Sequence, residues 1–209
     1  MIGVIDYQTG NSRSVIYALQ HLGVPGRLVE TPADCSGVER YILPGVGSAG
    51  VTMNSLRELG WIDHLNEKVV GEGRYFLGIC VGLQVLFAHS EEGDVDCLGW
   101  IPGQVRHFDA KVSGRVPHMG WNEATPSSGH PFGQDVPVEH YYFVNSYYVV
   151  PDRAEDSAAT TSYGNSFTSV AARGNIMGTQ FHAEKSGEAG LRLLRRFAAL
   201  NKEGVNAEE

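Results

Sequence analysis

Hydrophobic positions in the first part of the chain alternate between two spacings. Residues 53 to 70 and the set Val15, Ile16, Leu19 and Leu22 recur at the spacing of an amphipathic helix. Short apolar runs, typical of buried strands, cover residues 2–5, 24–29, 38–43 and 75–78. Strands and helices that alternate in this way form parallel sheets with right-handed crossovers. This part of the chain therefore predicts an α/β fold with a mostly parallel central sheet flanked by helices.

The pattern changes after Cys97. Short candidate strands follow at 103–108, 142–150, 158–163, 169–172 and 176–181, with no long helix among them. A final amphipathic helix has a predicted buried face formed by Leu191, Leu194, Phe197, Ala198 and Leu200. The stretches 117–122 and 126–137 are predicted to be loops, and 201–209 a frayed end. We therefore expect an antiparallel extension of the sheet and, because no linker divides the chain, one domain over residues 1–209.

Composition narrows the classes of function. The 209 residues carry 16 Lys and Arg against 24 Asp and Glu, and a net charge of −8 argues against nucleic acid or an anionic membrane as the partner. The three cysteines contain no Cys-x-x-Cys pair, which argues against a disulfide framework or a thiolate metal site. No apolar run is long enough to span a bilayer, and the N-terminus lacks a basic leader. We expect a cytoplasmic protein that needs no metal or cofactor.

One cysteine lies at a predicted strand-to-helix corner. The sequence Gly78-Ile79-Cys80-Val81-Gly82 is the thiol version of a nucleophile elbow. The two glycines are expected to let the backbone turn sharply, so that the Cys80 side chain stands above the strand ends. The first N–H groups of the following helix would then face whatever Cys80 attacks. Taken alone, the pentapeptide also fits a small buried cysteine at a packing point.

A second group of polar residues follows the last predicted strand. His182 and Glu184 are two residues apart, so their side chains are expected on the same side. Glu184 would hold one imidazole nitrogen and leave the other to take a proton from a thiol, which is the Cys–His–carboxylate arrangement of nucleophilic catalysis. Taken singly, they also fit a strand-end histidine and a solvated carboxylate.

A glycine-rich stretch, 44–50, follows a third predicted strand. Its glycines would let peptide N–H groups of Val46 and Gly47 join that of Val81 in an oxyanion hole. An ordinary glycine turn is the alternative. Because ligands collect at the carboxyl ends of parallel strands, we expect the three strand ends to meet at one site.

These motifs carry a resemblance to a known family. The stretches 78–84 and 180–187 resemble the class I, triad-type glutamine amidotransferases. Three further stretches, 6–15, 44–47 and 117–122, are similar to the glutaminase subunits of imidazole glycerol phosphate synthases within that family. The resemblance covers nearly the whole chain and implies a flavodoxin-like α/β fold with an antiparallel extension.

The resemblance also implies a role for each site residue. Cys80 would attack the side-chain amide of glutamine, His182 would act as base and then acid, and Glu184 would orient His182. Residues implied to hold the glutamine are Gln84, Ser146 and Tyr147. Hydrolysis of a glutamyl thioester would release ammonia to a separate (β/α)8 cyclase subunit, which makes imidazole glycerol phosphate and aminoimidazole carboxamide ribotide in histidine biosynthesis. Residues implied to lie toward that partner are Asn11, Met119, Trp121, Tyr142 and Lys185.

The sequence departs from the family pattern at three positions, none of which removes a reacting group. Gln8 stands where glycine is usual, Ala183 where proline is usual, and Asn145 replaces a frequent histidine. Three alternatives remain at this point: a glutaminase that serves another synthase, a thiol hydrolase of similar topology, and a binding module without activity. The glycines around Val46 also predict a peptide flip, so that the chain alone would be a poor glutaminase until its partner shifts this equilibrium.

Overall fold

The computed structural model describes residues 1–7, 11–127 and 138–200. Gln8, most of the predicted loop 126–137 and the predicted frayed end 201–209 lie outside the described residues. Within the described ranges, no helix has the length and apolar character needed to cross a membrane.

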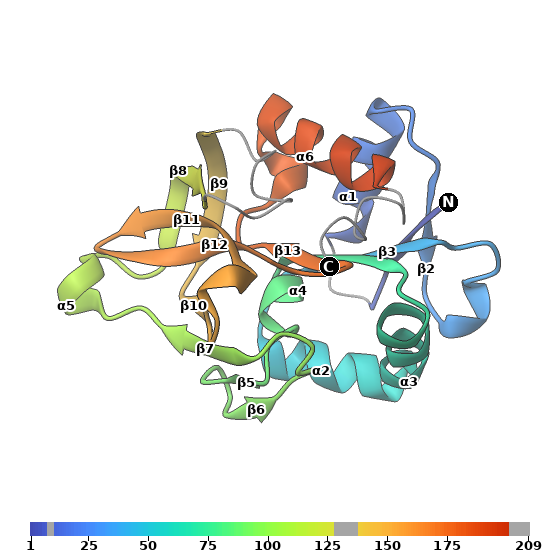
Figure 1. Cartoon of the computed structure of the whole chain (residues 1–209), viewed down its shortest axis with the longest axis horizontal. Coiled ribbons are helices and arrows are strands. Elements are labelled where there is room, and N and C mark those ends of the chain that lie inside the picture. The colour runs from blue at the N-terminus through green and yellow to red at the C-terminus, as the bar shows by residue number, and fades with distance from the viewer. Residues whose placement is uncertain (8–10, 128–137, 201–209) are drawn as a thin grey trace.

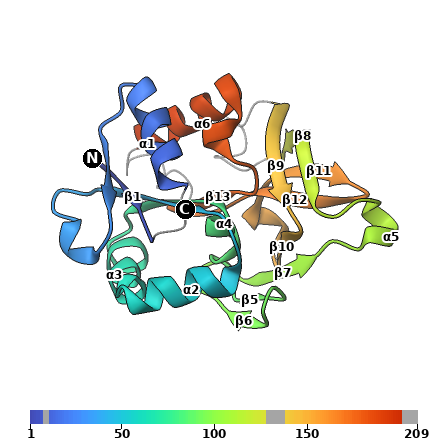
Figure 2. The same cartoon turned by 180° about the vertical axis from the view of Figure 1, so that it is seen from behind.

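A parallel sheet forms one half of the fold. Its strands run in the order β2 (Gly26–Val29), β1 (Ile2–Ile5), β3 (Arg40–Gly45), β4 (Tyr75–Cys80) and β13 (Ile176–Thr179), and all neighbours pair in parallel. Helices α1 (Ser12–His21) and α6 (Gly187–Ala199) cover one face, while α2 (Ala49–Glu58) and α3 (Trp61–Leu65) lie on the other (Figures 1 and 2). The predicted parallel sheet with helices on both faces is confirmed.

The antiparallel extension continues from β13. It is formed by β12 (Asn165–Arg173), β10 (Tyr147–Pro151) and β7 (Gly103–His107), with β5 (His89–Ser90) and β6 (Val95–Asp96) at its edge. Strands β11 (Ser157–Tyr163), β8 (His118–Pro126) and β9 (Glu139–Asn145) branch from β12, and the short helix α5 (Ala110–Ser113) precedes β8. Figure 1 shows this region beside the parallel half, so the predicted extension is also confirmed.

Two predicted element boundaries are wrong. The stretch 117–122, predicted as a loop, begins strand β8, because it pairs with β9 from His118 opposite Asn145 onward. The predicted strand 142–150 is two strands, β9 and β10, which are separated at Ser146. In the first case antiparallel pairing with β9 overrides the turn-like composition of the segment. In the second the chain leaves β9 at Asn145 and enters β10 at Tyr147, which pairs with a different strand, β7.

The glycine-rich stretch 44–50 also differs from the predicted loop. Pro44 and Gly45 complete β3, and Gly50 lies inside α2. Proline is tolerated there because β3 pairs with β1 only as far as Ile42, which leaves one edge of β3 without ladder bonds. The Ser48 hydroxyl accepts a hydrogen bond from the Val51 N–H and so caps the helix.

The final helix buries a slightly different face from the predicted one. Its buried residues are Ala189, Gly190, Leu193, Leu194 and Phe197, whereas the predicted Leu191, Ala198 and Leu200 are half-buried. Gly190 sits against the Ala183 carbonyl, where a Cβ would come within 1.8 Å of the oxygen. This close approach holds α6 directly against the turn that carries His182 and Glu184.

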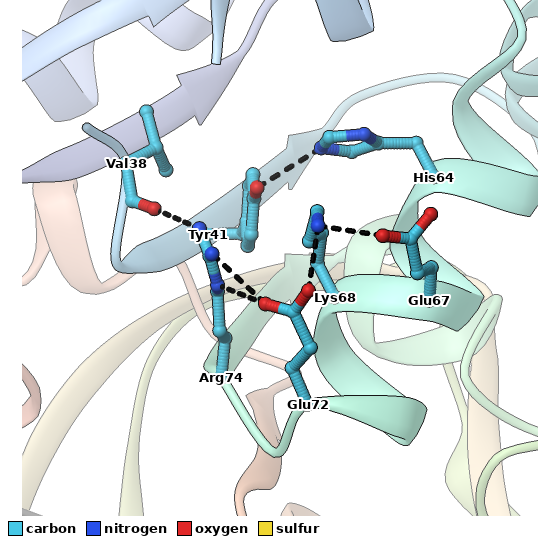
Figure 3. A network of polar contacts seen from close by, with 7 residues as sticks. All are labelled: Val38, Tyr41, His64, Glu67, Lys68, Glu72 and Arg74. Carbon is cyan, nitrogen blue, oxygen red and sulfur yellow. Dashed lines mark hydrogen bonds and ion pairs between the residues drawn. The ribbon is translucent and has the colours of Figure 1, made fainter. Parts of the chain in front are cut away.

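A polar network lies at the amino ends of β3 and β4 (Figure 3). Cys80 lies at the other, carboxyl end of β4. Arg74 donates to the Val38 carbonyl and pairs with Glu72, which also binds Lys68 at 2.6 Å. Tyr41 and His64 form a separate hydrogen bond of 3.0 Å. These contacts hold the π-helical turn Asn66–Gly71 against the amino ends of the strands. The carboxyl ends of β3 and β4, where Cys80 lies, are at the other end of the sheet.

Candidate active site

The corner at Cys80 is strained. Strand β4 ends at Cys80, and the four-residue helix α4 (Val81–Gln84) begins immediately after it. Cys80 has φ 57° and ψ −110°, a conformation that costs a non-glycine residue about 1–3 kcal/mol. Such strain is common where a side chain must be held at a functional site, and here it lifts the thiol above the strand ends.

The positions on either side of the corner, Gly78 and Gly82, have no room for a side chain. Neither Gly78 nor Gly82 has a positive φ, so the sharp turn itself falls on Cys80. A Cβ on Gly78 would lie 2.2 Å from the Gly82 carbonyl oxygen, and a Cβ on Gly82 would lie 1.9 Å from the Leu43 carbonyl oxygen. Strands β3 and β4 and helix α4 therefore touch backbone to backbone, which sets where Cys80 can stand.

His182 and Glu184 form a buried pair at the end of β13. The imidazole Nδ1 lies 2.8 Å from Glu184 Oε1, and both side chains are fully buried. The His182 peptide N–H bonds to the Tyr142 carbonyl, and the His182 carbonyl accepts from the Ser186 hydroxyl, so the turn is held from β9 and from α6. The backbone thus fixes the direction in which the imidazole faces.

Each partner changes the pKa of the other. Burial alone would lower the pKa of His182, but its contacts with Cys80 and with Glu184 outweigh burial and raise that pKa. Burial would raise the pKa of Glu184, but the hydrogen bond from His182 outweighs it and lowers that pKa. The site therefore favours an ionised carboxylate beside an imidazole that holds a proton strongly.

Cys80 lies beside the free nitrogen of this imidazole. His182 Nε2 is buried and has no hydrogen-bond partner within the described residues, while the thiol is close enough to contribute to the raised pKa of His182. Cys80 and His182 line the same cavity. The structure thus brings the three predicted catalytic side chains together, with Glu184 behind His182 and Cys80 in front of it.

Asn11 is placed differently from its prediction. It was expected to face a partner protein, but only 6% of the residue is exposed. Its side-chain amide donates to Glu184 Oε1 and lies 3.4 Å from His182 Nδ1, and it does not cap helix α1. The Asn11 side chain therefore supports the His182–Glu184 pair, and its contact with a partner stays a prediction.

The cavity above Cys80 has a volume of about 360 Å³. It is lined by all the residues predicted for the oxyanion hole and for glutamine binding, namely Val46, Gly47, Val81, Gln84, Ser146 and Tyr147. Gln84 is 3% exposed, and its Nε2 donates to the Tyr147 carbonyl at 3.2 Å. The three strand ends expected to meet therefore do meet, around one cavity.

Two residues at this site were not predicted. Gln180 Nε2 lies 3.8 Å from Cys80 Sγ, and its orientation is fixed because its Oε1 accepts from Gln84 Nε2 at 3.2 Å. Glu92 lines the cavity, and its Oε2 accepts from the Ala49 N–H at the start of α2 at 2.9 Å. Gln180 belongs to a recognised motif, but no motif surrounds Glu92, whose place follows from the fold alone.

Of the other residues predicted to face a partner, Met119, Trp121 and Lys185 are exposed, and Tyr142 is half-buried. Met119 and Trp121 on β8 are 64% and 57% exposed, unusually high values for such large apolar side chains. The Trp121 and Tyr142 rings meet edge to face with centroids 6.0 Å apart, and Lys185 is exposed on the turn after His182. We define Met119, Trp121 and Tyr142 as the aromatic patch.

The sequence matches one family of known proteins. The profile of glutamine amidotransferase class-I matches residues 3–200. Subunit HisH 2 of imidazole glycerol phosphate synthase from Pseudomonas aeruginosa is 39% identical over 96% of this chain and 100% of its own length. Subunit HisH from Desulfitobacterium hafniense is 45% identical over 94% of this chain and 93% of its own.

Two further comparisons extend this result. The chloroplastic imidazole glycerol phosphate synthase hisHF of Arabidopsis thaliana is 46% identical over 94% of this chain, which spans 34% of that longer protein. A crystal structure of a glutamine amidotransferase covers 95% of the chain with a TM-score of 0.73 at 23% identity, which supports the fold. The chain belongs to the class I glutamine amidotransferase family, as its sequence motifs predicted.

Proposed function

We propose that this chain hydrolyses glutamine to glutamate and ammonia through a thioester on Cys80. The observation that carries the proposal is the buried His182–Glu184 pair beside Cys80, at the wall of one cavity. His182 would take the thiol proton as Cys80 attacks the side-chain carbonyl carbon of glutamine, and Glu184 would stabilise the imidazolium. The same proton would then pass to the departing nitrogen, so that ammonia leaves and the thioester remains for water to hydrolyse.

The tetrahedral intermediate needs donors for its oxyanion. The Val81 N–H belongs to the first turn of α4 and has no partner inside that helix, so it supplies one donor. Val46 and Gly47 lie across the cavity, and the φ of 103° at Gly47 belongs to a region that glycine enters without strain. We assign the second donor to this peptide, whose flip would switch the site on.

The ammonia would be used by a second protein. The bacterial relatives are named as subunits of imidazole glycerol phosphate synthase, and the aromatic patch is the kind of surface that interfaces use. We therefore place this chain in the cytoplasm as the glutaminase subunit beside a (β/α)8 cyclase. That enzyme would use the ammonia to make imidazole glycerol phosphate and aminoimidazole carboxamide ribotide for histidine biosynthesis.

A glutaminase assay with and without the cyclase subunit and its ribonucleotide substrate tests this function. Because we propose that the Val46–Gly47 peptide has to flip, the chain alone should be slow, and the liganded partner should raise kcat by shifting that equilibrium. Full activity of the chain alone would contradict the switch. Capture of another ammonia acceptor on copurification, or turnover of peptides or esters without glutamine, would contradict the assigned function.

Glu92 is expected to recognise the α-ammonium group of glutamine. Its carboxylate is an anionic group in the cavity wall, and the α-ammonium is the only cationic group of the substrate. Glu92→Gln keeps an oxygen for the Ala49 N–H but removes the charge. A charged hydrogen bond contributes about 1.5–3 kcal/mol, so KM should rise about 10- to 100-fold with little change in kcat.

A matched control lies on the same helix that Glu92 caps. Glu58→Gln removes a carboxylate from the exposed last turn of α2, outside the cavity, and should leave KM unchanged. Steady-state kinetics of both variants with the partner present gives the comparison. Equal KM values for Glu92→Gln and the unmodified chain would exclude Glu92 from substrate binding.

A further inference from the structure

Gln180 lies beside Cys80 because of the register between two parallel strands. Strands β4 and β13 pair in parallel, and their last registered pair is Ile79 opposite Thr179. One step further along both chains brings Gln180 next to Cys80. The Gln180 peptide N–H also bonds to the Ser169 carbonyl of β12 at 2.8 Å, which holds the backbone from the neighbouring strand. The sheet therefore fixes where the Gln180 side chain begins.

The orientation of the Gln180 amide follows from a chain of hydrogen bonds. Gln84 Nε2 donates to the Tyr147 carbonyl at 3.2 Å, and a carbonyl can only accept, so the Gln84 amide cannot be turned the other way. The same Nε2 lies 3.2 Å from Gln180 Oε1 and donates to it. The Gln180 nitrogen is therefore the end that faces the thiol, 3.8 Å from Cys80 Sγ.

The sulfur is the acceptor that this nitrogen reaches within the described residues. Gln180 is fully buried, and the described residues that line the cavity do not include it. A buried N–H without an acceptor would cost free energy, so the contact with Cys80 Sγ satisfies it. Because sulfur is larger than oxygen, a contact of this length is still a weak hydrogen bond to the neutral thiol.

The strength of this contact depends on the charge of the sulfur. A thiol sulfur is a weak acceptor, whereas a hydrogen bond to an ionised group is about twice as strong. In the proposed reaction the sulfur is anionic after Cys80 gives its proton to His182, and again when the C–S bond of the thioester breaks. The Gln180 N–H therefore stabilises the thiolate more than the thiol or the thioester, and such a difference accelerates a reaction.

We propose that Gln180 is a second hydrogen-bond donor to the Cys80 sulfur, beside His182. The role in turnover rests on the proposed glutaminase function. In acylation the thiol proton passes from Sγ to His182 Nε2, the C–S bond forms, the C–N bond breaks, and the proton leaves with ammonia. In deacylation a water proton passes to His182 as the C–O bond forms. The C–S bond then breaks, the thiolate accepts from the Gln180 N–H, and His182 returns the proton to Sγ.

The ionisable groups around the sulfur stay the same when the amide is replaced. His182 faces Cys80 from the turn after β13, with Glu184 behind it. Glu92, from the turn after β5, and Tyr147, from β10, line the same cavity. Helix α4, which follows Cys80, has no ionisable side chain. A change in the pH dependence of Cys80 after this replacement therefore reports the loss of the amide.

The test is the pH dependence of Cys80 alkylation by iodoacetamide, measured on the whole chain by mass spectrometry of the Cys80 peptide. Only the thiolate reacts, so the rate rises with pH to a plateau. Gln180→Met keeps the length of the side chain and removes the donor. Its midpoint should lie about one pH unit above that of the unmodified chain, the loss expected for one hydrogen bond to a charged group. Its plateau should not fall, because a less stabilised thiolate is more nucleophilic.

Two further variants complete the comparison. Gln84→Leu removes the donor that orients the Gln180 amide, so its midpoint should rise in the same direction, and it tests the proposal even where Gln180→Met does not fold. Gln104→Met makes the same chemical change at an exposed position of β7, outside the cavity. It should leave both the midpoint and the plateau unchanged.

The effect on turnover is measured with the partner present. Gln180→Met should lower kcat for glutamine hydrolysis about 3- to 10-fold, because the lost hydrogen bond is partly offset by the higher nucleophilicity of the sulfur. KM should stay within about twofold of the unmodified chain, because Gln180 is not among the described residues that line the cavity. An unchanged kcat would contradict the role in catalysis.

Two alkylation results would overturn the assignment. One is an unchanged midpoint in both Gln180→Met and Gln84→Leu. The other is a lower plateau at an unchanged midpoint in Gln180→Met, because that is the effect of a displaced sulfur and not of a lost hydrogen bond. Alkylation needs no glutamine, so a shifted midpoint in a chain that hydrolyses none would support the contact with Cys80 and reject the proposed function.

Discussion

Cys80→Ser is expected to lower kcat for glutamine hydrolysis by roughly 10⁴- to 10⁶-fold, as loss of the nucleophile does in hydrolases with a catalytic triad. The hydroxyl keeps the position above the strand ends, but it is a far weaker nucleophile than the thiol. Glutamine should still bind, because the cavity residues Gln84, Glu92 and Tyr147 are unaffected. Single-turnover and steady-state assays with the partner present measure the loss.

The other two cysteines are matched controls. Cys35 and Cys97 donate to the carbonyls of Thr31 and Val95, outside the cavity. Burial raises the pKa of Cys35, and it raises the pKa of Cys97 to about 11, so both thiols are poor nucleophiles at neutral pH. Cys35→Ser and Cys97→Ser should keep kcat within about twofold of the unmodified chain. A loss as large as that of Cys80→Ser in either control would reject the assignment.

Gly82→Ala is expected to destabilise the fold and to inactivate the enzyme together. The new Cβ would lie 1.9 Å from the Leu43 carbonyl oxygen, and the atom it meets is backbone, which cannot move aside alone. The free energy of unfolding should fall by roughly 3 kcal/mol, as for overpacked cores. A shift of about 1 Å in the elbow would also lower kcat by about 10²-fold. Denaturant unfolding and the glutaminase assay measure the two effects.

Gly50→Ala is the control for this change. Gly50 lies inside α2, and a Cβ added there meets nothing within 4 Å. Alanine in place of glycine within a helix should raise the free energy of unfolding by up to about 1 kcal/mol, with kcat unchanged. If Gly82→Ala and Gly50→Ala behave alike, backbone contact between β3 and α4 does not position Cys80.

The parts of the site that could be predicted are those held together by local sequence. The elbow at Cys80 and the pair His182–Glu184 each fit within one strand end and the turn after it. Parallel strand order then brings these ends to one edge of the sheet. Sequence reasoning therefore predicted that the reacting groups converge.

The parts that could not be predicted depend on contacts between distant residues. Asn11 is 173 positions from Glu184, and nothing near Asn11 indicates that its amide would bond there. Glu92 lies in a polar turn between two very short strands, and it reaches the cavity only because that turn packs against the start of α2. The start of β8 has turn-like residues, and only pairing with β9 makes it a strand.

Labelling with a glutamine-analogue electrophile, followed by peptide mass spectrometry, tests most directly whether Cys80 is the nucleophile of a glutamine site. The account predicts an adduct on the peptide that contains Cys80, protection by glutamine, and no adduct on Cys35 or Cys97. Equal labelling of the three thiols, or labelling of Cys80 that glutamine does not slow, would contradict it.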